Sequence, residues 1–360
     1  FSFLASAAMD YCIKTNFQPD AIHVHEWGGV AGALAKTVYK EHFENIPVTL
    51  TIHNISYDFH CTSRHASKIG LPPEDFNIEG YEFWGKVSML KAAILYSSKV
   101  VFTSPSYLFY MLSVDLPGGM RGFLESQGNK LLGIQNGVDY NTWNLPKDYE
   151  AFKKKKKDEF RAELGLEASS GILLYSHLDS DLDASAQIIS TILANLLNMN
   201  LQLAIGISED NENYPYFVAM QEKNRSKIAL LPFTDNEESL CHRLSASDAF
   251  FSISTEDPSL SFFLKAAAVG SMPISGKRTD HAFTCIKPFT EQSAENKDKA
   301  SAFISANAFP DLILEQIRLA ESIFCENKSL WSKLVSNAVS IRATWDDTAK
   351  KYFSTFVPNS

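Results

Sequence analysis

The 360-residue chain is poor in cysteine and has no long uninterrupted apolar segment. No run reaches the roughly 18 apolar residues that a membrane-spanning helix needs, so the chain is predicted to be soluble, with no membrane span. The cysteines form no C-x-x-C pair, which argues against a zinc site and against a disulfide framework. We therefore expect free, packed thiols in a reducing compartment. The cysteines are Cys12, Cys61, Cys241, Cys285 and Cys325.

The chain also has fewer basic than acidic residues. The net charge is −9 and the pI is near 5.5, which argues against a general affinity for nucleic acid or for acidic membranes. The hydrophobic share of 45% and the charged share of 21% are ordinary for a globular protein with a real core. The length corresponds to about two domains. The chain opens at Phe1 in helix-like sequence, and no pattern of a signal or transit peptide is visible.

Short β-branched apolar segments alternate with longer helical patterns along the chain. This alternation predicts parallel sheets covered by helices on both faces, and it occurs in two successive series. The fold class is therefore predicted to be α/β. The expected strands lie at 21–25, 48–53, 99–104 and 131–136 in the first series, and at 171–176, 201–207, 227–232, 249–254 and 272–275 in the second.

A charged segment at 148–170 separates the two series. We predict a first lobe at 1–147, a linker at 148–170, a second lobe at 171–309, and helices at 310–360 that pack back across the lobes. The linker contains five consecutive lysines, Lys153 to Lys157. Such a run is either the solvated start of a helix between the lobes or a basic docking patch.

An acidic loop follows the first expected strand of the second lobe. Asp179, Asp181 and Asp183 occupy every second position, as at the start of a calcium-binding loop. That loop also needs glycine at its sixth position and a bidentate glutamate at its twelfth, where this chain has Ala184 and Ser190. No metal site is predicted, and the three aspartates remain the candidates if a divalent ion binds.

Four segments carry a family resemblance: "PDAIHVHEWGGVAGAL", "VTLTIHNISYDF", "LKAAILYSSKVVFTSPSY" and "LLGIQNGVDYNTWNLP". Together they resemble the starch and glycogen synthases, glycosyltransferase family five, and among these the plant soluble starch synthases of classes four and five. The resemblance implies two Rossmann-like lobes facing a cleft, the GT-B architecture, with ADP-glucose on the second lobe and an α-1,4-glucan on the first. The family's early K-x-G-G-L loop has no counterpart here, so the first lobe is expected to lack its earliest strands and to expose a sheet edge.

Polar residues follow several strands of the first lobe, where α/β sheets commonly bind ligands. In the family the corresponding histidine and asparagine residues face the sugar, so the resemblance implies a glucose-sized polar pocket. The alternative is that these side chains only cap helices and bridge loops. The family's Tyr-Gln-Gly here is Tyr57-Asp58-Phe59, a departure from its pattern. The glucan-binding candidates are His25, Glu26, Trp27, His53, Asn54, Asn136 and Asp139.

The donor-side motifs of the second lobe are degenerate when aligned with the family. In the loop R-L-T-x-Q-K-G, whose cations grip the diphosphate, His177 replaces the arginine and Leu182 the lysine. In E-P-C-G-L-T-Q, Asp257 replaces the glutamate and Leu260 the glycine. Loss of one preorganised oxyanion donor costs roughly 10²–10³ in rate, and nearby carboxylates repel a diphosphate. No catalytic residue is therefore expected.

Two further donor motifs are altered in the same direction. The family's K-T-G-G-L becomes "KRTDH", which loses both glycines, gains Asp280 and leaves Lys277 and Arg278 as remnants. The aromatic residue that stacks on the base falls near Asp235. The degeneracy thus extends over the whole donor pocket.

The sequence predicts a non-catalytic starch-synthase-like protein that needs no cofactor. It would bind an α-glucan (maltooligosaccharide or amylopectin), protein partners of starch granule initiation, or both, with little affinity for ADP-glucose. One alternative is an active retaining α-1,4-glucosyltransferase in which His177, Lys277 or Arg278 supplies the missing charge. A second is a metal-dependent activity in the altered cleft. The resemblance to plant enzymes implies the plastid, in the chloroplast stroma.

Overall fold

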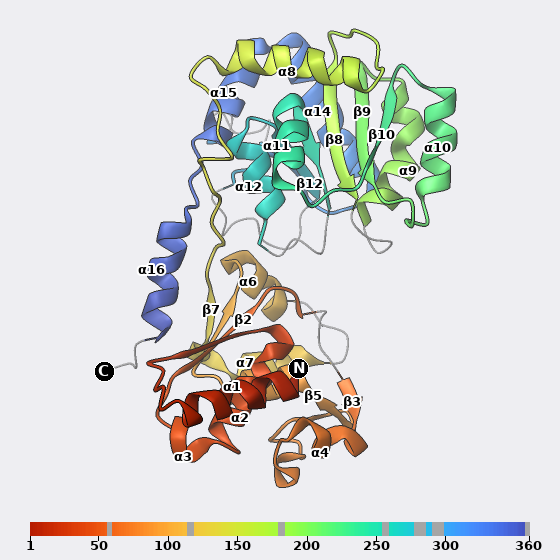
Figure 1. Cartoon of the computed structure of the whole chain (residues 1–360). Coiled ribbons are helices and arrows are strands. Elements are labelled where there is room, and N and C mark those ends of the chain that lie inside the picture. The colour runs from red at the N-terminus through yellow and green to blue at the C-terminus, as the bar shows by residue number, and fades with distance from the viewer. Residues whose placement is uncertain are drawn as a thin grey trace. The chain divides into compact units, whose positions relative to one another are not determined.

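The computed structural model describes residues 1–55, 60–113, 119–178, 184–253, 259–276, 286–289 and 299–356. Its contacts divide the chain into two compact units (Figure 1). The first unit is formed by residues 1–136 and 345–360, and the second by residues 137–344. The chain therefore passes between the units twice, once in each direction.

The first unit contains a four-stranded parallel sheet in the order β1-β2-β6-β7. Its strands are β1 (Ile22–His25), β2 (Val48–Ile52), β6 (Lys99–Phe102) and β7 (Leu131–Gly133). Its helices are α1 (Ser2–Lys14), α2 (Val30–Lys36), α3 (Lys40–Phe43), α4 (Ala66–Ile69), α5 (Met89–Tyr96), α6 (Pro105–Ser113), α7 (Met120–Ser126) and α16 (Trp345–Phe356), with a 3-10 turn, η1 (Glu26–Gly29), after β1.

The side chains of β2 alternate between the two faces of this sheet, and each face is covered by different groups. Successive strand side chains point to opposite faces, so Val48, Leu50 and Ile52 share one face and join the apolar core. The threonines between them point the other way, where the Thr49 hydroxyl donates to the Thr355 carbonyl of α16 at 3.2 Å. The final helix thus completes the sheet that begins the chain.

A small antiparallel sheet, β3-β5-β4, accompanies the parallel one in the first unit. Its strands are β3 (His60–Thr62), β4 (Glu82–Phe83) and β5 (Lys86–Ser88). None of its strands was predicted from the sequence. Ser88 ends β5 and caps α5, since its hydroxyl accepts a hydrogen bond from the Lys91 amide at 3.0 Å.

The second unit contains a six-stranded parallel sheet in the order β10-β9-β8-β11-β12-β13. Its strands are β8 (Ile172–Leu178), β9 (Leu201–Ile207), β10 (Ile228–Pro232), β11 (Ala249–Phe251), β12 (Met272–Gly276) and β13 (Phe303–Ser305). Its helices are α8 (Tyr149–Glu163), α9 (Ala184–Leu197), α10 (Tyr214–Lys223), α11 (Glu237–Ala246), α12 (Ser261–Ala268), α14 (Pro310–Glu326) and α15 (Lys328–Val339).

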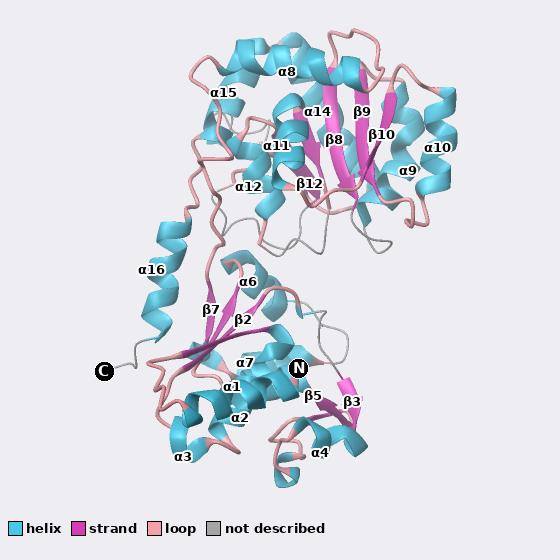
Figure 2. Ribbon diagram, in the orientation of Figure 1, coloured by secondary structure: helices cyan, strands magenta, loops and turns pink. Residues whose placement is uncertain are grey.

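The strand order of this sheet reverses at β8. The chain runs outward from β8 through β9 to β10, and then returns to β11 and continues to β13. Right-handed crossovers place α9 and α10 on one face and α11 and α12 on the other, with α14 against α9 and α8 against α11 (Figure 2). The carboxyl ends of β8 and β11 therefore form a topological switch point, where sheets of this kind bind ligands.

The unit boundaries differ from those that the sequence predicted. The first boundary lies at residue 136 rather than 147, because Val138 already pairs with the second unit, donating its amide to the Ala343 carbonyl at 2.8 Å. The segment 310–360 is divided between the units, with α14 and α15 in the second and α16 in the first.

The predicted linker is also part of the second unit. Its lysine run lies in α8, and only part of the run is solvated. Lys153 Nζ donates to the carbonyls of Ser247 and Val269 at 2.8 and 3.0 Å, and Lys157 Nζ lies 3.0 Å from the buried Asp248 carboxylate. Residues 153 and 157 are four apart and share one face of the helix, which docks on the core.

Within the described ranges, no helix combines the length and the hydropathy required to cross a bilayer. Cys12, Cys61, Cys241 and Cys325 are free thiols, each partly buried. The fifth cysteine, Cys285, lies outside the described residues.

Candidate functional site

In the first unit, four of the predicted residues meet at the carboxyl ends of two neighbouring strands. His25 ends β1 and His53 follows β2, and their Nδ1 and Nε2 atoms lie 2.9 Å apart. The Glu26 carboxylate accepts hydrogen bonds from the backbone amides of His53 and Asn54, the latter at 2.8 Å. The parallel pairing of β1 with β2 brings these residues together.

Glu26 has an unusual backbone conformation. Its φ of +49° lies in the left-handed region, which costs a residue with a side chain roughly 1 kcal/mol or more. This conformation turns the chain directly from β1 into η1 and aims the carboxylate at the amides that follow β2. Burial raises the pKa of Glu26, while the two amide hydrogen bonds act in the opposite direction. Backbone strain of this kind is concentrated at functional sites.

Both imidazoles of the pair are exposed on one side and favour the neutral form. Burial lowers the pKa of His25 and of His53, and the charge of His25 lowers that of His53 further. Two neutral rings joined by one hydrogen bond leave one donor or acceptor nitrogen on each ring. Sugar hydroxyls both donate and accept, so the pair suits an uncharged polyol.

A third histidine, which was not among the predicted site residues, lies on the same face of the sheet. His23 Nε2 lies 2.9 Å from the Thr51 hydroxyl, and the His23 ring packs on Tyr352 and Phe356 of α16. Burial, followed by the charges of the neighbouring histidines, lowers the pKa of His23 to about 4. The His-x-His spacing of β1 was the available signal, because residues two apart on a strand share a face.

The other three glucan-binding candidates of the first lobe have different surroundings. Trp27 lies half-buried in η1 against the Phe1 ring. Asn136 follows β7, two strands away from β2, and its amide donates to the Thr103 carbonyl at 3.1 Å. Asp139 belongs to the second unit, where its carboxylate accepts from the Asn141 amide, the Asn141 side chain and the Thr142 hydroxyl, each at 3.0 Å. These hydrogen bonds lower the pKa of Asp139 and bind it to its own turn.

In the second unit, His177 lies at the carboxyl end of β8, beside the switch point. Its side chain is 4% exposed and stacks on Phe233, with ring centroids 4.6 Å apart, and contacts Phe262. Burial, followed by the charge of Arg243, lowers the pKa of His177 to about 4. His177 is therefore uncharged near neutral pH.

A hydrogen-bonded chain links this histidine to Tyr175 and Arg243. Arg243 donates to the Tyr175 hydroxyl oxygen at 3.4 Å, so the hydroxyl proton is free to point at His177 Nδ1, 3.0 Å away. Nδ1 then accepts and Nε2 carries the ring proton. Over the described ranges, Nε2 is buried with no hydrogen-bond partner. Gly206 makes room for this cluster, because a Cβ there would lie 2.7 Å from the Tyr175 hydroxyl.

The backbone at Leu260 keeps a glycine-like conformation. This residue was predicted from the resemblance to stand at the position of a glycine, and its φ of +56° is in the left-handed region at the start of α12. The side chain is nevertheless buried. The turn therefore has a backbone conformation that favours glycine but contains a buried apolar side chain.

The remaining predicted donor-side and metal candidates lie outside the described residues. Among the residues that the structure places, no group of three or more histidine, cysteine or acidic side chains is arranged to hold a metal ion. The candidates outside the described ranges are Asp179, Asp181, Leu182, Asp183, Asp257, Lys277 and Arg278, together with Asp280 and the segment 57–59.

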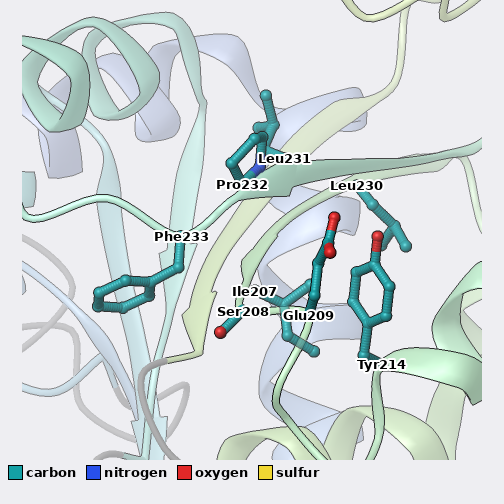
Figure 3. Close-up of a pocket in the computed structure, with 8 residues that line it drawn as sticks. All are labelled: Ile207, Ser208, Glu209, Tyr214, Leu230, Leu231, Pro232 and Phe233. Atoms are coloured by element: carbon teal, nitrogen blue, oxygen red, sulfur yellow. The ribbon is translucent and has the colours of Figure 1, made fainter.

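A pocket of about 410 Å³ opens at the carboxyl ends of β9 and β10, beside the start of α10 (Figure 3). Its walls are mainly apolar, with Phe233 joining it to the ring of His177. Glu209, Ser208 and Tyr214 supply its polar groups. A carboxylate at its wall makes this space unfavourable for an anion. The lining residues are Ile207, Ser208, Glu209, Tyr214, Leu230, Leu231, Pro232 and Phe233.

The fold and the strand-end sites define an α/β protein with two Rossmann-like units, and its structural neighbours are GT-B glycosyltransferases. The catalytic domain of starch synthase IV from Arabidopsis thaliana, bound to ADP and acarbose, superposes with a TM-score of 0.86 at 21% identity, over 99% of this chain and 76% of that one. HepE from Anabaena, in complex with UDP and glucose, superposes with a TM-score of 0.61 at 15% identity, over 96% and 80% of the two chains.

Sequence comparison finds similar proteins among the starch and glycogen synthases. Residues 1–126 match the family model of the starch synthase catalytic domain. The glycogen synthase of Aromatoleum aromaticum is 29% identical over 98% of this chain and 72% of its own length. That of Thermosipho melanesiensis is 26% identical over 97% and 74%. These matches support the starch and glycogen synthase family, glycosyltransferase family five, for this chain.

Proposed function

We propose that the chain is a starch-synthase-like protein that binds an α-glucan and does not transfer glucose from ADP-glucose. The observation that carries the proposal is the state of His177. The family's arginine at this position grips the diphosphate, whereas His177 is buried, has a pKa of about 4 and is bound to Tyr175. A neutral imidazole cannot stabilise the charge that develops on a departing diphosphate as a guanidinium does.

The first unit supports the glucan part of the proposal. His25 and His53 face each other as neutral, partly exposed rings, and the Glu26 carboxylate fixes the two amides that follow β2. This arrangement offers donors and acceptors without a net positive charge, which favours sugar hydroxyls over phosphate. The catalytic domain of starch synthase IV from Arabidopsis thaliana is bound to ADP and acarbose in its solved structure.

The second candidate function is active transfer from ADP-glucose, and the curated relatives that the chain resembles are named glycogen synthases. Arg243 favours it, since its guanidinium lies close to His177 and no carboxylate partner is recorded for it among the described residues. In this case Lys277 and Arg278 would supply further charge. A metal-dependent activity through Asp179, Asp181 and Asp183 is a more distant candidate.

Partners and location belong to the same proposal and rest on the resemblance to plant starch synthases. We propose action at starch granule initiation through glucan and protein binding, and location in the chloroplast stroma. Microscopy of a fluorescent fusion of the complete protein tests the location, and co-purification from plastid extract, with and without glucan digestion, tests the partners. A fusion outside plastids contradicts this part and leaves the glucan proposal standing.

Calorimetric titration tests the main proposal directly. The chain is titrated with maltoheptaose and, separately, with ADP-glucose, and incorporation of labelled glucose into amylopectin is measured. We expect binding of the glucan, no heat from ADP-glucose and no incorporation. Saturable binding of ADP-glucose, or incorporation above a boiled control, would overturn the non-catalytic reading.

Two histidine variants locate the glucan site. His53→Ala removes one ring of the facing pair and is expected to weaken maltoheptaose binding at least about tenfold, the equivalent of roughly 1.4 kcal/mol. His42→Ala changes an exposed histidine on α3 and is expected to bind as the parent chain does. Equal affinity of both variants would place any glucan site elsewhere.

A further inference from the structure

Trp84, in the turn between β4 and β5 of the small sheet in the first unit, has a strained backbone conformation. β4 and β5 are joined by a two-residue turn, Trp84-Gly85, in which both residues have positive φ, +51° and +75°. These angles are those of a type I′ turn, which strongly prefers asparagine, aspartate or glycine at its first central position. A bulky residue in the left-handed region is a genuine outlier.

Packing does not explain why this turn contains tryptophan. The Trp84 side chain is 76% exposed, so it contributes little to the core. The edge of its ring rests near Gly119, where an added Cβ would lie 3.7 Å from Trp84 Cζ2. The indole is therefore seated against backbone along one edge while most of its surface faces solvent. A residue that strains its turn without burying itself points to a role outside folding.

The surroundings of Trp84 combine aromatic rings with hydrogen-bonding groups. Cross-strand pairing sets Phe83, Lys86 and Thr62 in one row across the sheet. The Phe83 ring meets Trp84 edge-on, at 6.4 Å and 71°, and lies parallel to the His60 ring at 6.1 Å. Lys86 and Thr62 are exposed beside this aromatic row.

We propose that this face of the small sheet is a second α-glucan site, in which a pyranose ring stacks on Trp84 and its hydroxyls bond to Lys86 and Thr62. A pyranose has an apolar C–H face bounded by hydroxyls, which matches a flat ring flanked by polar side chains. A protein partner would instead favour a contiguous apolar patch. The ligand class rests on the proposed function, but the surface is separate from the strand-end residues of the parallel sheet. A chain that crosses both surfaces binds long glucans more tightly than short ones.

Variants at Trp84 test the site without risk to the fold. Trp84→Gly and Trp84→Asn remove the ring and suit the turn better, so both chains are expected to be at least as stable to urea as the parent. Their affinity for amylopectin, measured by gel retardation, and for maltoheptaose, measured by calorimetry, is expected to fall about tenfold. Trp84→Tyr keeps a ring and is expected to retain most of the binding. Phe309→Ala, at an aromatic residue of the second unit that is 65% exposed, is the matched control.

The outcomes separate this inference from the proposed function. Loss of binding in Trp84→Gly with an unchanged Phe309→Ala supports the surface site. If the parent and Trp84→Gly bind glucan equally while His53→Ala does not, the surface site is wrong and the proposed function stands. If Trp84→Gly loses binding and His53→Ala keeps it, the surface site stands and the strand-end site is wrong. Absence of glucan binding by the parent chain overturns both.

Discussion

His177 illustrates how burial, rather than residue type, sets the chemistry of a single position. The sequence alignment with the family located the substitution of an arginine, and the residue type alone left partial protonation open. The structure adds two aromatic neighbours, Phe233 and Phe262, and a cation, Arg243, which together favour the neutral ring. None of these three residues is close to position 177 in sequence, so a single sequence does not reveal their effect.

This burial predicts a pH dependence of stability. The pKa of His177 is about 4 in the folded chain and about 6.5 when unfolded, so the unfolded state takes up the proton first on acidification. The free energy of unfolding should therefore fall as pH drops from 6.5 towards 4, by up to about 3 kcal/mol from this group. Urea titrations at pH 7, 5.5 and 4.5, followed by hydrogen exchange in β8, measure the effect.

The matched variants of this test are His177→Phe and His42→Ala. The first removes the titrating group and should flatten the pH profile of the second unit, whereas the second should keep the parent profile. A His177→Phe chain with the parent's slope would show that His177 is not the group responsible. His23, whose pKa is also about 4, lies in the first unit and is followed separately through exchange in β1.

At the scale of elements, the lysine run shows that residues of one charged segment can lie on different faces of a helix. Lys157 Nζ lies 3.0 Å from Asp248, whose carboxylate also accepts the Leu173 amide at 2.7 Å. Lys155 is 77% exposed and only approaches Glu159, at 3.8 Å. The sequence does not distinguish the five lysines from one another. Their positions around the axis of α8 do, because only some of them face the core.

We predict unequal costs for two substitutions in this run. Lys157→Met leaves the buried Asp248 without its cation and is expected to lower the free energy of unfolding by about 3 kcal/mol. Lys155→Met is expected to change it by less than about 0.5 kcal/mol, because exposed pairs contribute little. Urea denaturation of both variants at pH 7 measures the difference. Similar values for the two would contradict the docking of α8 through Lys157.

Among the secondary-structure elements, the sequence predicted best those with the longest apolar pattern. The strands of both parallel sheets follow from short apolar segments, as at β2 and β9, with the exception of β13, which was not predicted. The small sheet was not predicted because β3, β4 and β5 have two or three residues each, too few for a period of two to be recognised. At the strand ends, the family motif located His25 and His53, but not His23, whose ring packs on Tyr352 of α16.

At the scale of the whole molecule, the last helix belongs to the first unit. Tyr352 and Thr355 of α16 meet Thr51 and Thr49 of β2 through hydrogen bonds of 3.1 and 3.2 Å. These contacts join residues about 300 positions apart, so no local pattern could have assigned α16 to either unit. The sequence predicted only that the helices at 310–360 pack back across the lobes.

Removal of this helix should destabilise one unit selectively. A chain without residues 345–360 is expected to lose hydrogen-exchange protection in β1 and β2, because the threonine face of β2 becomes exposed and its hydroxyl partners are lost. Protection in β8 and β9 should remain within about twofold of the parent. Phe353→Ala, at a ring that is 68% exposed on the same helix, is the control and should leave both regions unchanged. Equal loss in the two units would contradict the assignment of α16 to the first.

The double passage of the chain between the units has a consequence for biosynthesis. A ribosome produces residues 1–136 first, but the helix that covers their sheet is encoded after all of the second unit. The polar face of β2 therefore stays uncovered while about 200 further codons are translated. This takes between about 10 and 40 seconds at ordinary elongation rates. The second unit is complete before the first can close, so the order of folding is the reverse of the order of synthesis.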